Sequence, residues 1–497
     1  MRITICLLLL ANLAFAQKND IRLKGMDAEI DHILKAYNAV GMSVAVVENN
    51  KVIHMQGFGY RDAEHQLPVT PNTIFPIGSI TKSFTASLLG MLEGQGQLSL
   101  KDKPSQYIPA LKFYSNEMDN HIAIDNLLSH TTGIGNADGS YILFPAESRL
   151  ALMPRLQYLQ PDGTPKDRWI YSNMGYIIAG TIAEQVSKQS WEQNIEQKIF
   201  TPLGMSSSGT SIAAMSKSAD YAFGYGMSNG KVEKVLFEEQ ENARPAGAIT
   251  STASDMVKRL NIWLNNGSID GKTILPEAYV QEAISFKAID NGHPPDASEP
   301  GVYLFGYGYG WRVNSYKGHY KVQHGGNVSG FSSQVVMYPT DKLGVVVLTN
   351  QTNSILPYVI TDLVASRMLK LPRTEWNKYP VKVSDINVVS KEIKGIDTEK
   401  KPTHVLADYS GKYANPGYGT FEIVNEANAL YAVFPKHKLR LEHQHYDVFV
   451  LKATEEIPQN MNPEFCMNFS VNDDGDVAGV SINLQQEPVK FLKQEKE

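Results

Sequence analysis

Hydrophobic residues recur at helical spacing in several separate stretches of the chain. Apolar side chains return every three or four positions over residues 26–37 and 83–95, which predicts two helices with one buried face each. Further helices are expected over residues 177–186, 191–199 and 355–369. Amphipathic helices of this kind need a second apolar surface to pack on.

Runs of β-forming residues supply that surface. Strands are predicted at 42–47, 52–60, 320–324, 331–338 and 343–349. The first two are joined by Asn49-Asn50, which is typical of a hairpin, and the last two by a short turn. Strands joined by short turns pair in the antiparallel sense. We therefore expect a mixed α/β (α+β) fold, with an antiparallel sheet flanked by helices.

The pattern changes beyond residue 371. Residues 373–403 are charged, interrupted by proline and poor in aromatic residues, which indicates a linker. From residue 404 onward, short alternating runs dominate and are separated by turn signals such as Asn472-Asp473-Asp474-Gly475. These runs predict a separate small all-β domain over residues 404–495, either an antiparallel barrel or a sandwich.

The N-terminal segment differs from both parts. Arg2 is followed by an apolar run over residues 3–13 and by the small-residue ending Ala14-Phe15-Ala16, which is the pattern of an export signal cleaved before Gln17. The run is too short to span a bilayer, and no later segment reaches the roughly 20 apolar residues that a spanning helix needs. We therefore expect an exported protein, periplasmic or extracellular, with no membrane span.

Composition excludes some classes of partner. A net charge of −6 gives no basic footprint for nucleic acid. Cys6 lies in the expected signal, so Cys466 has no partner for an intramolecular disulfide. His437, His443 and His445 have no carboxylate or cysteine at ligand spacing, so neither a metal site nor a cofactor is expected.

The most informative stretch precedes the helix over residues 83–95. Pro76-Ile77-Gly78 breaks the extended segment before it, so Ser79 stands at the helix start and Lys82 lies one turn further on the same face. A serine hydroxyl becomes a nucleophile when a base removes its proton, and a lysine whose pKa is lowered by burial can act as that base. A helix cap beside a solvated lysine is the alternative, because the same pattern recurs at Ser228-Asn229-Gly230-Lys231 in a turn.

Two other short motifs carry polar side chains. Tyr171 and Asn173 stand two residues apart, so in an extended loop both would face the same side. His324 ends a predicted strand with a possible hydrogen-bond donor, and Gly325-Gly326 after it would let a substrate backbone lie close. His130 has small hydroxyl residues and a glycine around it, so we expect it to fix a loop by hydrogen bonding rather than to act in catalysis.

The order and spacing of the three motifs resemble those of the penicillin-recognising serine hydrolases. This family includes class C β-lactamases, D-alanyl-D-alanine carboxypeptidases, D-aminopeptidases and related esterases. The resemblance covers roughly residues 25 to 370 and extends to the segments 127–133 and Pro245-Ala246-Gly247. It implies a β-lactamase/transpeptidase-like fold, in which a helical subdomain accompanies the sheet.

The C-terminal unit resembles the lipocalin-like module that follows some of these hydrolases, on the strength of Tyr409-Ser410-Gly411-Lys412-Tyr413 and the number of strands. The expected division of the chain is a signal peptide at 1–16, a serine hydrolase domain at 22–372, a linker at 373–403 and a lipocalin-like β-barrel domain at 404–495.

The resemblance also implies a role for each motif residue. Ser79 would be the acylated nucleophile, Lys82 its proton-transfer partner, and Tyr171 a base or a relay to the leaving group. The oxyanion hole would consist of the backbone amides of Ser79 and Asn327, and Asn173 would bind the substrate amide. Substrate-binding positions are accordingly expected at Asn173, His324, Gly325, Gly326 and Asn327.

Departures from the motif pattern bear on the substrate. The third motif has His324 and two glycines where the class A pattern has Lys-Thr-Gly. Histidine does not supply the fixed positive charge that binds a β-lactam or peptide carboxylate, which favours the D-aminopeptidase or esterase branches. We expect an exported serine hydrolase that cleaves an amide or ester of a peptide, a D-amino-acid peptide or a small ester. A β-lactamase and a non-catalytic protein that binds cell-wall peptides or penicillin are the alternatives, and the oligomeric state stays open.

Overall fold

The computed structural model describes residues 20–135, 137–228, 231–291, 301–372, 375–378, 397, 399–453, 465–485 and 487–495. The expected export signal at 1–16 and most of the expected linker at 373–403 lie outside these residues. Within the described part of the chain, no helix combines the length and the apolar character needed to cross a membrane.

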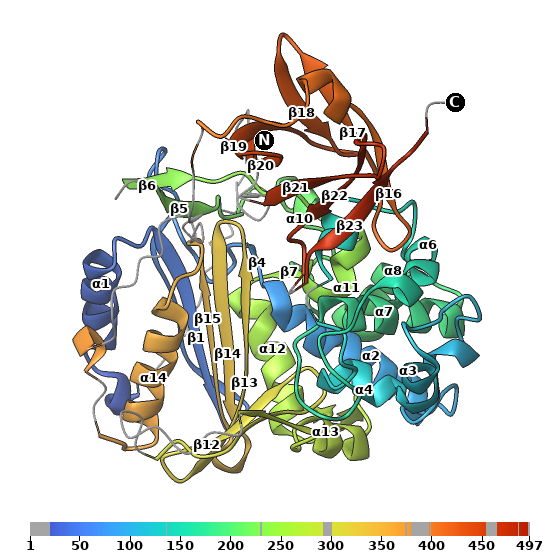
Figure 1. Ribbon diagram of the computed structural model, residues 1–497. Coiled ribbons are helices and arrows are strands. Elements are labelled where there is room, and N and C mark those ends of the chain that lie inside the picture. The colour runs from blue at the N-terminus through green and yellow to red at the C-terminus, as the bar shows by residue number, and fades with distance from the viewer. Residues whose placement is uncertain are drawn as a thin grey trace, which may run out of the picture.

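The larger N-terminal domain is built around an antiparallel sheet of nine strands, in the order β10-β11-β12-β13-β14-β15-β1-β2-β3 (Figure 1). The first hairpin and its short neighbour are β1 (Gly41–Glu48), β2 (Lys51–Asp62) and β3 (Leu67–Pro68). The remaining strands are β10 (Ala288–Asn291), β11 (Phe305–Tyr307), β12 (Arg312–Tyr316), β13 (His319–Val328), β14 (Phe331–Tyr338) and β15 (Leu343–Thr349). Within this domain the first strand, β1, pairs with the last strand, β15, so the beginning and the end of the domain meet in the middle of the sheet.

Helices cover both faces of this sheet, which explains why its central strands are apolar throughout. On β15, Val345 and Val347 pack with α1 (Met26–Ala36) and α14 (Leu356–Met368). The alternate residues Val346 and Leu348 belong to the core on the other side, with α2 (Thr81–Gly94) and α12 (Ala253–Leu264) (Figure 1). Because successive strand residues point to opposite faces, a valine-rich strand can serve two helical layers at once.

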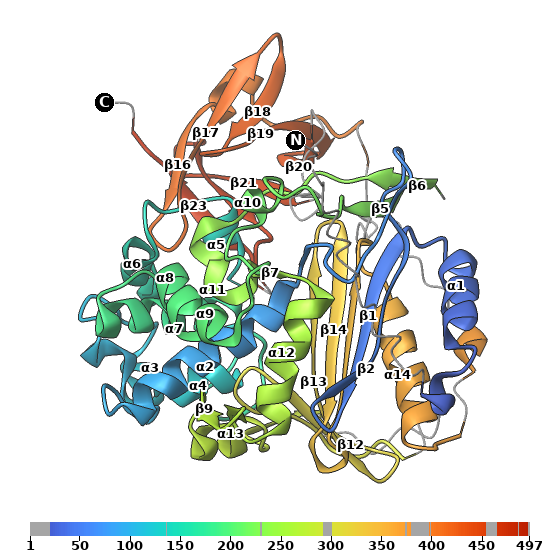
Figure 2. The same ribbon diagram turned by 180° about the vertical axis from the view of Figure 1, so that it is seen from behind.

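A helical subdomain lies beyond α2, as seen from the opposite side in Figure 2. Its longest helix is α7 (Asn173–Ser187), which packs against α2. The shorter helices are α3 (Asn116–His121), α4 (Ile124–Ser129), α5 (Gly139–Ile142), α6 (Arg149–Leu152), α8 (Trp191–Ile195), α9 (Thr201–Leu203), α10 (Ile212–Met215), α11 (Arg244–Gly247) and α13 (Glu277–Ala283). The helix expected over 191–199 is α8 followed by a π-helical turn, Glu196–Phe200.

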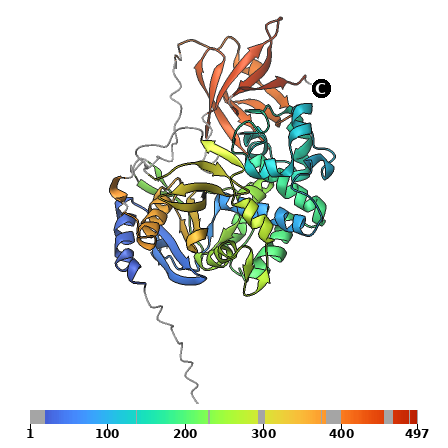
Figure 3. The same cartoon turned by 90° about the horizontal axis from the view of Figure 1, so that it is seen from below.

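The C-terminal unit is a closed barrel of eight antiparallel strands. Its strands are β16 (Gly411–Asn415), β17 (Gly419–Glu426), β18 (Ala429–Val433), β19 (Lys438–His445), β20 (Val448–Ala453), β21 (Cys466–Val471), β22 (Val477–Ile482) and β23 (Val489–Lys493). The barrel lies against the helical subdomain (Figure 3). These features confirm the expected fold class, a helix-flanked antiparallel sheet followed by a small all-β barrel.

The alternating runs that predict strands in this unit end at Leu484, so the final strand, β23, was not predicted. It pairs with β16 through Tyr413 and Lys493 and so closes the barrel. Only Val489 and Phe491 of its five residues are buried, and Lys490 and Leu492 between and after them are exposed on the outer face. This apolar alternation is too short to predict a strand, which the pairing with its neighbours defines instead.

Candidate active site

A tight turn ahead of α2 presents Ser79. The short strand β4 (Phe75–Pro76) pairs with β7 (Thr250–Ser251), and the 3-10 turn Gly78–Ile80 then leads directly into α2. Gly78 has φ +53, and a Cβ on it would lie 2.8 Å from the backbone nitrogen of Asn327. Glycine is therefore needed both for the left-handed backbone and for the close approach of β13.

Lys82 is completely buried one turn after Ser79. Its Nζ lies 3.1 Å from Ser79 Oγ, 2.7 Å from Asn173 Oδ1 and 2.8 Å from the carbonyl oxygen of Ala246. Burial lowers the pKa of the Lys82 amine to about 7, and the carboxylate of Asp138 opposes part of that shift. A solvated lysine beside a helix cap is thereby excluded.

The three contacts of Lys82 define the direction of its lone pair. The side-chain oxygen of Asn173 and the carbonyl of Ala246 can only accept hydrogen bonds, so they take two hydrogens of the amine. In the neutral amine the lone pair is left for the third neighbour, the hydroxyl of Ser79. This is the arrangement in which an amine can remove a proton from serine.

Tyr171 reaches the same point from the loop before α7. The loop is held by His130, whose Nδ1 accepts a hydrogen bond from Ser172 N at 3.1 Å and whose carbonyl accepts one from Ile170 N at 2.8 Å. Tyr171 lines the same cavity as Ser79, and its ring centroid lies 4.8 Å from Lys82 Nζ. Burial raises the pKa of the Tyr171 phenol, so at neutral pH Tyr171 is a proton donor rather than a phenolate.

Asn173, the first residue of α7, has both ends of its amide engaged by the protein. Its oxygen accepts from Lys82, and its nitrogen donates to Asp138 Oδ2 at 2.8 Å. The hydroxyl of Tyr141 donates to the other oxygen of Asp138. Sequence reasoning missed Asp138, which stands in a loop with no recognisable motif.

His324 lines the same cavity as Tyr171, and both of its ring nitrogens have hydrogen-bond partners. Its Nδ1 lies 2.6 Å from the carbonyl oxygen of Gly325, which can only accept, so Nδ1 carries the hydrogen. Its Nε2 then accepts from the hydroxyl of Tyr307 at 2.7 Å. Burial lowers the pKa of His324 to about 3, and the imidazole is therefore neutral.

The glycines after His324 serve the protein's own packing rather than only a substrate. A Cβ on Gly326 would come within 1.9 Å of the carbonyl oxygen of Ile77, and one on Gly325 within 2.8 Å of the Tyr358 hydroxyl oxygen. Gly326 therefore lets β13 lie directly against the turn that carries Ser79. The pairing of β13 with β12 ends at Gln323, so Asn327 stands on a part of β13 whose edge is turned toward that turn.

Two cavities meet at Ser79. One, of about 310 Å³, is lined by Asp138, Asn173 and the segment from Phe237 to Gln240, and we call it the Asn173-side cavity. The other, of about 560 Å³, is lined by Tyr171, His324 and Arg312, and we call it the Tyr171-side cavity. Both volumes fall in the range of small-molecule sites, roughly 300–1,000 Å³.

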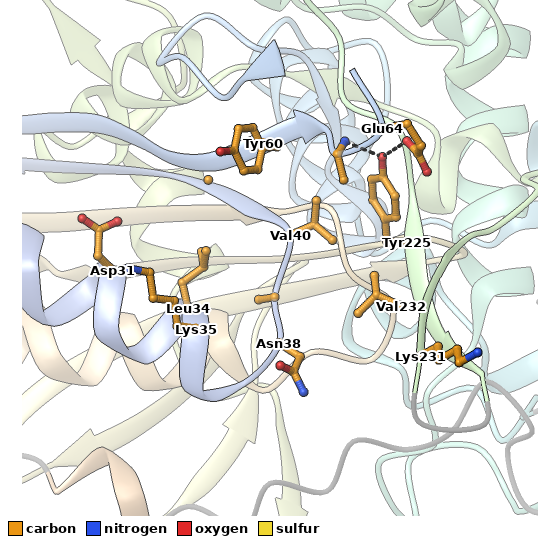
Figure 4. Close-up of a pocket in the computed structure, with 13 residues that line it drawn as sticks. Asp31, Leu34, Lys35, Asn38, Val40, Tyr60, Glu64, Tyr225, Lys231 and Val232 are labelled. Atoms are coloured by element: carbon orange, nitrogen blue, oxygen red, sulfur yellow. Dashed lines mark hydrogen bonds between the residues drawn. The ribbon is translucent and has the colours of Figure 1, made fainter. Parts of the chain in front are cut away.

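A larger cavity, of about 910 Å³, lies elsewhere, between α1, β2 and the hairpin of β5 (Tyr225–Ser228) and β6 (Lys231–Lys234) (Figure 4). It shares no lining residue with the two cavities at Ser79. The hydroxyl of Tyr225 there donates to Glu64 and accepts from Ala63 N. The second Ser-x-x-Lys sequence is in this hairpin, where Ser228 pairs with Lys231 across the two strands and starts no helix.

Within the described part of the chain, no cluster of three or more His, Cys, Asp or Glu side chains is arranged to hold a metal ion. Among the barrel histidines, His437 Nε2 lies 3.0 Å from Glu238 Oε2, and His443 Nε2 lies 2.9 Å from the carbonyl oxygen of Tyr446. Cys466 is a half-buried free thiol on β21, and burial raises its pKa.

Comparisons with known proteins agree with this geometry. The family described as Beta-lactamase matches residues 26–363, and a domain of unknown function, DUF3471, matches residues 397–495. The chain is 27% identical over 435 residues to unguisins hydrolase ungD' of Aspergillus campestris, covering 81% of this chain and 78% of that protein. It is 28% identical over 345 residues to protein flp of Staphylococcus aureus, covering 68% of this chain and 65% of that protein.

Solved structures show the same fold. The octameric penicillin-binding protein homologue from Pyrococcus abyssi aligns with a TM-score of 0.62 at 23% identity, over 95% of this chain and 99% of that one. A class C beta-lactamase aligns with a TM-score of 0.57 at 24% identity, over 70% of this chain and 96% of that one. Because the beta-lactamase family match spans most of the chain and contains every element that surrounds Ser79, this protein belongs to the beta-lactamase family of serine hydrolases.

Proposed function

We propose that this protein is an exported serine hydrolase that cleaves an amide or ester bond of a peptide or small ester through an acyl-enzyme at Ser79. The observation that carries the proposal is the buried amine of Lys82, whose lone pair is left for the Ser79 hydroxyl by its two other contacts. A desolvated lysine of lowered pKa beside a serine is the arrangement that a nucleophile needs and that a purely binding protein does not.

In the proposed acylation step, Ser79 Oγ attacks the substrate carbonyl while its proton passes to neutral Lys82. The backbone nitrogens of Ser79 and Asn327 would stabilise the oxyanion, each by roughly 3 kcal/mol of barrier. The leaving group then takes a proton from the phenol of Tyr171, which regains one from the Lys82 ammonium. Water attacks the acyl-enzyme by the same route in reverse, releasing the acid and restoring Ser79.

We assign the two cavities to the two halves of the substrate from the position of Tyr171. Tyr171 lines the Tyr171-side cavity and does not line the Asn173-side cavity. The leaving group would therefore occupy the Tyr171-side cavity and the acyl part the Asn173-side cavity. The amide oxygen of Asn173 is bound by Lys82 and its nitrogen by Asp138. We therefore propose that the main role of Asn173 is to orient the Lys82 amine, and that it contacts substrate only through the second lone pair of its amide oxygen.

The proposal is tested with a fluorescent alkyl fluorophosphonate and intact-mass analysis. We expect one adduct, located on Ser79 by peptide mapping and absent from Ser79→Ala. Hydrolysis of D-amino-acid amides, short esters and cephalosporins would then identify the substrate class. A protein that gains no adduct, or that is labelled equally after Ser79→Ala, is not a serine hydrolase of this kind, and slow stoichiometric acylation without turnover would favour the penicillin-binding alternative.

One observation favours a β-lactamase or another enzyme for substrates with a carboxylate on the leaving side. Neutral His324 provides no cation, but Arg312 lines the same cavity, with its guanidinium carbon 4.8 Å from the ring centroid of Trp169. A guanidinium is suited to bind a carboxylate. Turnover of nitrocefin that is lost in Arg312→Gln would support this function, and the absence of nitrocefin turnover in the wild type would exclude it.

A further inference from the structure

The barrel packs against the segment that carries Asp138. Phe144, two residues after the end of α5, is 1% exposed and lies among aromatic rings of the barrel. Its ring stacks on Phe491 at 5.6 Å between centroids and meets three further rings, those of Tyr418, Phe421 and Phe434. The larger domain thus inserts one of its own side chains into the core of the barrel.

A single guanidinium reinforces this anchorage. Arg155 Nη1 donates to the carbonyl oxygens of Ser140 and Phe144, at 3.0 and 2.7 Å, and to that of Tyr418 in the barrel, at 2.8 Å. Gly139 lies so close to the barrel that a Cβ there would be 3.5 Å from the side chains of Tyr418 and Leu484. Both ends of α5 are therefore held against the barrel.

The residue before α5 reaches the catalytic group. Asp138 accepts from the amide nitrogen of Asn173 at 2.8 Å, and the amide oxygen of Asn173 accepts from Lys82 Nζ at 2.7 Å. Burial raises the pKa of Asp138, and the hydrogen bonds from Tyr141 and Asn173 and the charge of Lys82 oppose that rise. The ionised carboxylate can only accept, so it turns the nitrogen of Asn173 toward itself and the oxygen toward Lys82. If the amide were reversed, two hydrogen-bond donors would face each other at Lys82.

We propose that the barrel positions the catalytic amine through this chain of contacts, from Phe144 and α5 to Asp138, Asn173 and Lys82. Asp138 is then a positioning residue for the acylation step, and the barrel is required for activity although it contributes no atom to the chemistry. The inference rests on the proposed serine hydrolase function.

The test measures the rate at which the fluorophosphonate labels Ser79, as a function of pH, in four full-length proteins. Asp138→Asn changes the inner end of the contact chain, and Phe144→Leu the outer end. Phe449→Leu is the matched control, because Phe449 is 2% exposed in the same barrel and packs on Tyr409, His443 and Phe469 instead of Phe144. The wild type is the reference.

We expect Asp138→Asn and Phe144→Leu each to slow labelling, by roughly 10- to 100-fold, as a misplaced catalytic group does. In Asp138→Asn the acid limb of the profile should also move to lower pH, because loss of the carboxylate favours neutral Lys82. A merely structural role for Asp138 would not move that limb. The other titratable groups that face Lys82 are Tyr171, Tyr176, His130 and His324, and Asp138→Asn leaves all four in place.

Thermal unfolding first shows whether each variant is folded at the assay temperature, and Phe449→Leu should then label at the wild-type rate. If Phe144→Leu does not fold, Arg155→Gln loosens the same anchorage through hydrogen bonds alone and should slow labelling too. Wild-type rates and an unmoved acid limb in Asp138→Asn, or equal rates in Phe144→Leu and Phe449→Leu, would overturn the inference while leaving the serine hydrolase intact. A wild type that gains no Ser79 adduct would instead overturn the proposed function itself.

Discussion

The imidazole Nδ1 of His130 accepts a hydrogen bond from the backbone nitrogen of Ser172, 3.1 Å away. His130 is fully buried and left-handed, at φ +60, and the bond fixes the loop that carries Tyr171. His130→Asn keeps a residue that tolerates this backbone but does not reach Ser172. We expect it to lower the free energy of unfolding by about 1–3 kcal/mol, measured in urea, and to slow ester hydrolysis. Unchanged hydrolysis would show that the loop does not depend on His130.

Buried histidines should make the fold sensitive to mild acid. Burial lowers the pKa values of His130 and His324, the latter to about 3, so the unfolded chain binds protons that the folded one excludes. The stability that depends on keeping these histidines neutral is fully present above the unfolded pKa of about 6.5, and it is lost as the pH falls below that value. From pH 7.5 to 5.5, each histidine should cost about 1.4 kcal/mol of unfolding free energy.

Urea unfolding of the wild type and His324→Gln at the two pH values measures this effect. The variant should lose less stability on acidification than the wild type, whereas His121→Gln, at an exposed position, should behave like the wild type. Equal losses in all three proteins would show that His324 becomes protonated without cost in the folded state.

The phenol of Tyr171 should matter most when the leaving group is basic. Because its pKa is raised, Tyr171 can protonate a departing amine but is not needed for a leaving group that departs as a stable anion. We expect Tyr171→Phe to lower kcat for an amide substrate by roughly 10²- to 10⁴-fold and for a nitrophenyl ester by much less. Equal losses on the two substrates would argue that Tyr171 acts before the leaving group departs.

The close approach at Gly326 should be intolerant of any side chain. A Cβ there would lie 1.9 Å from a backbone oxygen of the turn before Ser79, so β13 would have to move. Gly326→Ala should lower the unfolding free energy by about 1–3 kcal/mol and reduce labelling of Ser79. Gly247→Ala, at a position where a Cβ meets nothing within 4 Å, is the control for stability. Wild-type stability in Gly326→Ala would mean that the turn adapts freely.

Local chemistry explains which parts of the site the sequence could predict. Ser79 and Lys82 are separated by one helical turn, so their proximity follows from periodicity, and α2 begins where the break at Pro76 and Gly78 predicts. The loop-fixing role of His130 also followed from its neighbours. Asp138 and Arg312 had no such signal, because they meet Asn173 and Trp169 only through tertiary contacts.

The barrel shows the same limit. Alternating runs predicted most of its strands, but closure through β23 depends on pairing between residues far apart in the chain, Tyr413 and Lys493. Nothing in the sequence indicated that Phe144 inserts into the barrel either, because the pattern around a phenylalanine in a loop does not show which domain buries it. Tertiary contacts set both features, within the barrel for β23 and between the domains for Phe144, and no local pattern encodes them.

The pH dependence of Ser79 labelling tests most directly whether neutral Lys82 is the base. Because burial lowers the pKa of Lys82 to about 7, the labelling rate should be low at pH 5, rise with a midpoint near pH 7 and reach a plateau by about pH 9. Lys82→Met should remove both the fast rate and the rise. A rate that is flat from pH 5 to 9, or a Lys82→Met variant with the wild-type profile, would contradict the account.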